Sequence, residues 1–299
     1  MAVLAEAGRI SRSLSAPLYL IHADGFDSEK EERFRAALRK LMLDDRARIH
    51  FECGEPSEAI LKAQREENID LLVAGAMETE TVHRNFTGDV ARELLRRAPC
   101  DLLLYTEPKE EPKPPEAILV TIPDFSDLSR YVFHRAVSVA ERNGSKHVTI
   151  LYVQTTFAEA KEKALGSDSP SPEESLQSLV CTRGNSNLEL DYHLLRGNTG
   201  FTACEYIQAS GTDLVVMPSH MPSANQSTFA SALDWIIQVI PANLWVVRNV
   251  ARILEKLNCL QMSQVFSVST HCSLSGFAFQ GFCARRISRK TNGRIPPFL

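Results

Sequence analysis

Residues 54–75 read GEPSEAILKAQREENIDLLVAG, and residues 197–218 read GNTGFTACEYIQASGTDLVVMP. In both stretches a glycine precedes a helical pattern and an aspartate precedes an apolar run, and each of these residues recurs after 143 positions. A second match follows, with APCD before LLLY at residues 98–105 and IPAN before LWVV at residues 240–247. A repeat of this length, built from helices and strands, indicates two copies of one α/β domain rather than a solenoid.

The rest of the chain alternates apolar strands with helices in both copies. This alternation is typical of a parallel sheet that is covered by helices on both faces. The predicted strands are residues 17–23, 46–53, 69–74 and 101–106 in the first copy, and 117–122, 147–153, 188–195, 213–217 and 243–248 in the second. The predicted helices are residues 2–14, 28–44, 56–67 and 88–97, and then 127–143, 200–210 and 230–239.

We divide the chain into two domains, a linker and a tail. The first domain spans residues 1–106, and the second spans residues 116–249 with a polar insertion at 155–187. The linker, residues 107–115, reads EPKEEPKPP and is semi-rigid, because proline favours extended backbone. The tail, residues 250–299, is basic and matches neither copy, and we expect it to be poorly ordered.

One strand of the second copy, residues 117–122, has no counterpart in the first copy, which begins directly at the following helix. The first domain is therefore incomplete at its N-terminus, and we expect about fifteen further residues before Met1. The missing strand would be central, and its loss would leave two strand edges unpaired. Either another segment, such as a piece of the tail, fills this slot, or the first domain folds poorly.

Composition and charge narrow the classes of function. The 299 residues carry a net charge of −4, although six basic and no acidic residues follow Glu255. Residues 1–255 are thus more acidic than the full chain, and this acidity argues against nucleic-acid binding by the two copies. The seven cysteines form no CxxC pairs, which indicates reduced thiols in a cytoplasmic protein. No stretch has the apolar density of a membrane-spanning helix.

Several motifs resemble those of the universal stress protein family. They are the Pro-Asp-Phe-Ser turn at residues 123–126, the Gly-x15-Asp spacing into an apolar strand, and Ala-Pro-Cys before the final strand of the first copy. The resemblance covers residues 1–249. It implies in each copy an open, five-stranded parallel sheet of the adenine-nucleotide alpha-hydrolase-like type, with strand order 3-2-1-4-5. The ligand crevice would lie at the carboxyl ends of the first and fourth strands.

The ATP-binding branch of this family carries G-x2-G-x9-G-S/T after the fourth strand, because glycines let backbone N–H groups approach phosphates. In the first copy Gly75 and Gly88 match this motif. Glu78 stands in place of the second glycine, and Asp89 in place of the serine or threonine. Two carboxylates at this position would repel a triphosphate.

The second copy departs from the motif differently. Asp124 matches the aspartate that contacts adenosine, but Pro218 and Met221 replace two glycines and Ala230-Ser231 replaces the Gly-Ser pair. Because proline removes an N–H donor, this loop cannot form the same cradle. The resemblance thus implies that both nucleotide sites are degenerate and that the protein binds no cofactor. The alternative is that ATP or AMP binds. A nucleotide would contact Asp124, Val153, Met217, Ser231, Gly75 and Gly88.

Other reactive side chains have simpler explanations. Cys100 lies between a helix and a strand and is predicted to be a small buried side chain rather than a nucleophile. His22 ends an apolar strand near the crevice. It is interpreted as a structural histidine, and a contact with the ligand is the alternative. The sequence contains no metal-ligand spacing, phosphate loop or nucleophile elbow. We therefore expect no catalytic residues, no metal and no enzymatic activity.

These features favour a non-catalytic tandem protein that acts in stress response or regulation, through domain pairing and contacts with an unidentified protein. Residues 102–105 and 244–247 are the predicted pairing strands, within one chain or in a homodimer, because unpaired sheet edges are a liability. Two alternatives stay open. One is a nucleotide or small-molecule sensor. The other is the soluble regulatory part of a membrane transporter, the only case in which a membrane would be a partner.

Overall fold

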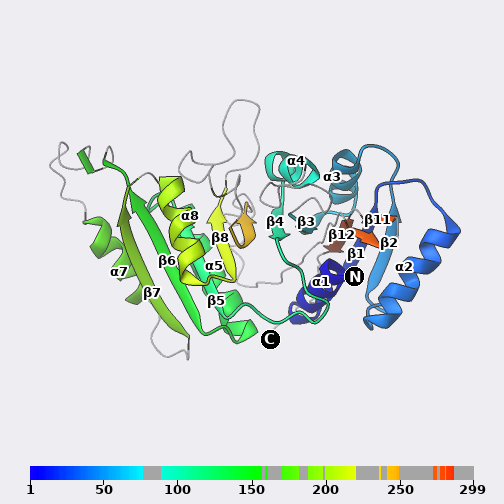
Figure 1. Ribbon diagram of the computed structural model, residues 1–299, viewed down its shortest axis with the longest axis horizontal. Helices are drawn as coiled ribbons and strands as arrows, with labels where there is room; N and C mark the ends of the chain where they lie inside the picture. Colours follow the sequence, from blue (N-terminus) through cyan, green and yellow to red (C-terminus); the bar gives the residue numbers. More distant parts are fainter. Residues whose placement is uncertain are drawn as a thin grey trace, which may run out of the picture.

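The computed structural model describes residues 1–76, 89–156, 159–160, 170–181, 188–197, 199–219, 236, 241–248, 272–274, 277–279 and 281–285. Its strands are β1 (Leu18–His22), β2 (Ala47–Phe51), β3 (Ile69–Gly75), β4 (Asp101–Tyr105), β5 (Ala117–Ile122), β6 (His147–Gln154), β7 (Glu189–Arg196), β8 (Leu214–Pro218), β9 (Asn243–Val247), β10 (Cys272–Leu274), β11 (Phe277–Phe279) and β12 (Gly281–Arg285). Ten of them form one sheet across both copies, in the order β2-β1-β12-β3-β4-β9-β8-β5-β6-β7 (Figure 1). β10 and β11 form a separate pair.

A single sheet replaces the two five-stranded sheets that the sequence predicted. The last strands of the two copies, β4 and β9, pair in antiparallel orientation, with Leu102 opposite Val246 and Leu104 opposite Leu244. These strands are the segments 102–105 and 244–247. Pairing covers both edges, because each strand satisfies the open backbone groups of the other. We call this junction of β4 and β9 the seam.

A piece of the tail occupies the slot of the missing strand. β12 lies between β1 and β3 and is antiparallel to both, with Phe282 opposite Leu20 and Cys283 opposite Leu72. The corresponding strand of the second copy, β5, is parallel to both of its neighbours. The tail, which we expected to be poorly ordered and outside the domains, therefore contributes the strand that completes the first half of the sheet.

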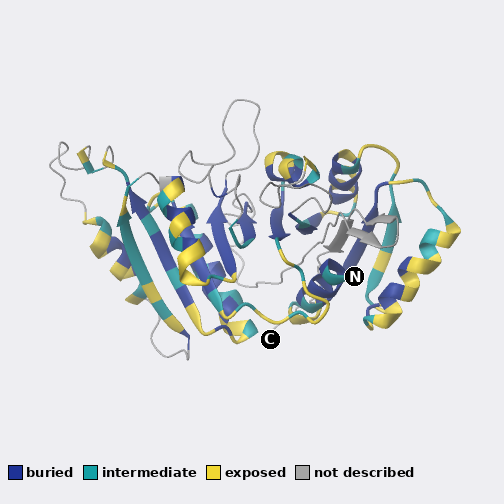
Figure 2. Cartoon of the chain, viewed as in Figure 1, coloured by how far each residue is buried: buried dark blue, intermediate teal, exposed yellow. Residues whose placement is uncertain are grey.

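Helices cover both faces of the sheet. Core residues of α1, α2, α5 and α7 share one hydrophobic cluster, and those of α3, α4 and α8 share the other. Figure 2 shows that the central strands are buried, whereas the edge strands β2 and β7 and the outer surfaces of the helices are more exposed. No helix among the described residues is both long and apolar enough to cross a membrane. The helices are α1 (Ala2–Ser13), α2 (Ser28–Lys40), α3 (Pro56–Glu66), α4 (Asp89–Arg97), α5 (Asp127–Asn143), α7 (Pro172–Cys181) and α8 (Thr199–Ser210).

The sequence sets both ends of α5, the helix nearest the predicted crevice. The Ser126 side chain caps the first turn by accepting a hydrogen bond from the Ser129 amide. Gly144 ends the helix with a φ of 70°, a left-handed conformation that favours glycine. Most of the side chains that α5 buries are apolar, but Arg135 is buried among them.

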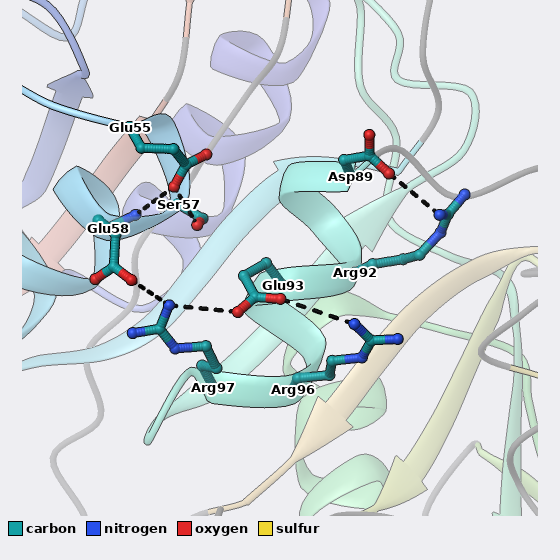
Figure 3. A network of polar contacts seen from close by, with 8 residues as sticks. All are labelled: Glu55, Ser57, Glu58, Asp89, Arg92, Glu93, Arg96 and Arg97. Atoms are coloured by element: carbon teal, nitrogen blue, oxygen red, sulfur yellow. Dashed lines mark hydrogen bonds and ion pairs between the residues drawn. The ribbon is translucent and has the colours of Figure 1, made fainter.

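Exposed ion pairs connect α3 to α4 on the outer surface (Figure 3). The Glu55 carboxylate caps α3 by accepting a hydrogen bond from the Glu58 amide over 3.1 Å. Arg97 pairs with Glu58 and, over 3.3 Å, with Glu93. Because water and salt screen such pairs, we expect them to contribute little to stability.

Candidate functional site

Asp124 follows β5, where the crevice was predicted, and its carboxylate organises the local turn. Its Oδ1 accepts hydrogen bonds from the Ser126 amide at 3.0 Å, the Ser126 hydroxyl at 2.5 Å and the Ser129 hydroxyl at 2.9 Å. The three donors lie at the start of α5. One oxygen of the aspartate that the resemblance assigned to adenosine thus holds the N-terminus of a helix.

β3 and β8 correspond to the fourth strand of the family's fold in the two copies. The backbone amide that follows each of them is already hydrogen-bonded within the sheet. The Ala76 N–H donates to the Tyr105 carbonyl over 2.8 Å, and the Ser219 N–H donates to the Val247 carbonyl over 3.0 Å. The two amides occupy equivalent positions in the repeat. Pro218, one residue earlier in the second copy, has no N–H at all. A phosphate at either strand end would therefore lack these backbone donors.

Two predicted contact residues are part of the hydrophobic core. Val153 is 8% exposed and Met217 is fully buried, and both belong to the cluster beneath α3, α4 and α8. Gly75 ends β3, and a Cβ atom there would meet Val3 at 3.9 Å, an ordinary contact distance. Space alone therefore does not require a glycine at this position.

Among the predicted contact residues that the structure describes, Asp124 is exposed and Gly75 is partly exposed, while Val153 and Met217 are buried in the core. Asp89 is the exposed first residue of α4 and pairs with Arg92 over 3.1 Å. Five residues of the predicted phosphate loops lie outside the described residues: Glu78, Gly88, Met221, Ala230 and Ser231.

Comparison with known proteins decides the family. The sequence model described as "Universal stress protein family" matches residues 2–106 and again residues 116–248. The chain belongs to the universal stress protein family. It contains two universal stress domains in tandem, and their sheets merge at the seam.

Solved structures share the fold of both domains together. A protein of Pseudomonas aeruginosa UCBPP-PA14 named as a universal stress protein has a TM-score of 0.64 and 13% identity, covering 85% of this chain and 91% of that chain. A universal stress protein of Archaeoglobus fulgidus DSM 4304 has a TM-score of 0.56 and 15% identity, covering 82% and 93%. At these identities the likeness concerns the fold alone. No curated protein matches the sequence significantly.

Buried charges join the two universal stress domains at the seam. Asp101, the first residue of β4, is fully buried, and its Oδ2 lies 2.7 Å from Nη2 of Arg135 in α5. Its Oδ1 accepts a hydrogen bond from the Arg248 amide over 2.9 Å. A carboxylate of the first domain therefore binds two arginine residues of the second domain.

The two arginine side chains find different partners. Arg248 is fully buried and donates to the carbonyls of Leu95 and Ala98, at the C-terminal end of α4. Burial lowers its pKa to about 10, although neighbouring Cys100 and Asp101 oppose this shift. A cation at this end of a helix also complements the helix dipole.

The second cation, Arg135, stacks on the core. Its guanidinium carbon lies 5.2 Å from the centre of the Trp245 ring, and Nη1 donates to the Tyr131 hydroxyl over 3.2 Å. Burial alone would lower the pKa of Arg135, but attraction by Asp101 and Tyr131 outweighs it, and the net pKa is raised. Arg135 is thus a buried cation in a domain interface. A sequence signal existed, because this arginine falls among the mostly apolar residues that α5 buries.

His22 is a buried side chain without a hydrogen-bond partner among the described residues. It is 4% exposed, and its ring makes edge contacts with Phe34 and Phe51 at centroid distances of 5.2 and 5.9 Å. Burial and, to a lesser extent, nearby Lys30 lower the pKa of His22. The neutral imidazole therefore packs as part of an aromatic cluster.

We expect the free energy of unfolding to fall as the pH is lowered through about 6.5, the pKa of histidine in an unfolded chain. Below that pH the unfolded chain binds a proton that buried His22 in the native state resists, and the loss grows by at most about 1.4 kcal/mol per pH unit. Urea titrations between pH 5 and 8 measure this slope. His22→Leu should reduce it, whereas Ile21→Val, a substitution in the same strand that changes no titratable group, should not. An unchanged slope in His22→Leu would contradict the assignment.

Cys100 is unsuited to nucleophilic chemistry. It is 4% exposed, and burial is the largest of the influences that raise the pKa of its thiol far above the ordinary value. The thiol is thus protonated and covered at neutral pH, whereas a reactive cysteine needs an accessible thiolate. This environment supports the prediction of a small buried side chain.

One cluster of possible metal ligands escaped the sequence reasoning. Potential ligand atoms of His50, Glu52 and Glu66 lie within 4.8 Å of one another. The Lys62 ammonium, however, lies 2.8 Å from Glu52 Oε1 and 3.9 Å from Glu66 Oε1. A lysine already neutralises these carboxylates, so the cluster is explained as a surface ion-pair group. The sequence signal was the i, i+2 spacing of His50, in β2, and Glu52, which follows the end of that strand.

Proposed function

We propose that this universal stress protein is non-catalytic and acts in stress response or regulation, through the pairing of its own domains and contacts with another protein. The observation that carries the proposal is the seam. The edge strands β4 and β9 cover each other, and the buried Asp101–Arg135 pair ties the two domains across them. The paired domains form one platform, which we place in the cytoplasm.

Degenerate nucleotide sites are the second element of the proposal. The amides of Ala76 and Ser219 are hydrogen-bonded within the sheet, and Pro218 supplies no donor. One oxygen of Asp124 already accepts three hydrogen bonds from the start of α5. Because these groups are already hydrogen-bonded, few backbone donors remain to bind a triphosphate. The absence of catalysis is supported by the covered, protonated thiol of Cys100.

Thermal unfolding with Mg-ATP, AMP or cyclic AMP tests this proposal against the sensor alternative. We expect no change in Tm at millimolar nucleotide. A ligand that binds only the native state would stabilise it by about 2.7 kcal/mol at a concentration of 100 Kd. A Tm that rises with ATP or AMP and loses this dependence in Asp124→Ala would establish a working nucleotide site and overturn the degenerate one. Ser126→Ala, which also disturbs the turn, controls for a structural effect at this position.

A further inference from the structure

A cavity of about 560 Å³ lies between the two universal stress domains, away from the predicted crevice. Its walls come from α1, the end of α5, the linker and several strands on either side of the seam. Figure 1 shows the chain leaving β4, passing α1 and entering β5 along this side of the sheet. The volume falls in the range of about 300–1,000 Å³ that is usual for small-molecule sites.

The deep part of the cavity is apolar. The residues that form it belong to the hydrophobic cluster beneath α1 and α5 or pack against that cluster. Such a surface favours a ring or an alkyl chain, because burying apolar area removes it from water. These residues are Ile10, Leu14, Leu71, Leu103, Val139 and Trp245.

Some of the charges around the cavity already have partners. Arg9 lies 3.5 Å from Glu6 and donates to the Tyr105 hydroxyl over 3.3 Å. Lys146 lies 2.5 Å from Glu116. These pairs hold the wall in place and contribute little net charge.

Three other cations of the wall form no ion pair with any described residue: Lys109 and Lys113 of the linker, and Arg142 of α5. Their exposed side chains surround the mouth. Among the lining carboxylates, Glu6 and Glu116 are already paired with cations. Glu107 and Asp213 keep their negative charges, although Asp213 accepts hydrogen bonds from two backbone amides at 2.8 and 3.0 Å. Three cations therefore face two carboxylates, and the mouth keeps a small excess of positive charge.

A polar donor of the wall also lacks an acceptor. Trp245 is 3% exposed, and its indole Nε1–H has no hydrogen-bond partner among the described residues. Protein atoms cover this donor, so the wall offers a ligand the apolar ring of Trp245 rather than its N–H group. The cavity thus combines an apolar floor with unpaired cations at the mouth.

We propose that this interdomain cavity binds an amphipathic organic anion, a molecule with an apolar ring or chain and one carboxylate, sulfonate or phosphate group. Its apolar part lies on Leu71, Leu103 and Trp245, and its acidic group meets Lys109, Lys113 and Arg142. Because both domains and the linker form the wall, the ligand stabilises their paired arrangement. This function goes beyond the proposed role and does not depend on the nucleotide crevice.

A matched pair of fluorescent dyes tests the proposal: anionic 8-anilinonaphthalene-1-sulfonate and its uncharged analogue, N-phenyl-1-naphthylamine. We expect the anion to bind saturably, with one molecule per chain, and more tightly than the neutral dye. In a Trp235→Phe background, excitation of Trp245 should be transferred to the bound anion. Replacing Lys109, Lys113 and Arg142 together by glutamine should weaken its binding about tenfold and leave the neutral dye unaffected.

The control removes three exposed cations elsewhere, by Lys40→Gln, Arg65→Gln and Arg130→Gln together, and should leave both affinities unchanged. Val139→Phe fills part of the cavity and should weaken both dyes. Retained cooperative unfolding separates cavity binding from the dye uptake of a molten globule. Non-saturable binding, no transfer from Trp245, or equal losses in the cavity and control triple variants would overturn the proposal.

Discussion

Replacing Asp101 by asparagine should lower the free energy of unfolding by about 3–5 kcal/mol, the usual effect of removing one partner from a buried ion pair. The substitution preserves the size of the side chain but removes the charge that lies 2.7 Å from Arg135. Arg135 is 8% exposed and would remain as an uncompensated cation next to Trp245. The substitution should therefore destabilise the seam between the two domains.

Urea titration monitored by tryptophan fluorescence measures this loss. The matched control is Asp89→Asn, which removes the same charge from an ion pair whose aspartate side chain is 87% exposed, and it should have little effect (Figure 3). The double variant Asp101→Asn with Arg135→Met should recover part of the stability, because no unpaired cation stays buried. If the two Asp→Asn variants lose equal stability, the buried pair does not hold the seam.

A proline in place of Cys283 should unfold the first domain, whose entire stability is on the order of 5–15 kcal/mol. Cys283 lies opposite Tyr19 of β1 on one side and Leu72 of β3 on the other. Proline removes a backbone donor and restricts φ, and it is not tolerated in a strand that is paired on both edges. Loss of β12 would also expose the facing edges of β1 and β3.

Amide hydrogen exchange resolves this effect strand by strand. In Cys283→Pro, we expect the amides of β1 and β3 to lose protection, while those of β6 and β7 keep theirs. Cys283→Ala retains the backbone donor and should behave as the unmodified chain. If β1 and β3 stay protected in the proline variant, β12 is not what closes the first half of the sheet.

The repeat made the α/β class and the course of most strands predictable, because glycine, aspartate and apolar runs recur at a fixed spacing. Residues 102–105 and 244–247 were predicted as the pairing strands, because unpaired sheet edges are a liability, and β4 and β9 do pair there. The repeat pattern alone does not specify this pairing, because it depends on contacts far apart in the sequence. The position of β12 was equally hard to predict. Nothing in its sequence, GFCAR, specifies an antiparallel place between two strands from the start of the chain.

The candidate site was harder to predict than the fold. Asp124 was assigned by family resemblance, yet its hydrogen bonds to Ser126 and Ser129 also serve the helix cap, which any aspartate in that turn could do. Val153 and Met217 are apolar, and an apolar pattern does not separate a crevice wall from the core. Asp101 was predicted only as the first residue of a strand, and its role in the seam was missed because its partners lie in the other domain.

The reversal of direction at the seam has a geometric consequence. Apart from β12, the strands of each half are parallel to one another, and β4 is antiparallel to β9, so a pseudo-twofold axis relates the halves. β3 and β8 therefore run in opposite directions, and their carboxyl ends lie on opposite sides of the common sheet along the strand direction. Molecules held at the two predicted crevices could not touch each other. Communication between them would have to pass through the seam, where one continuous chain keeps the two halves together.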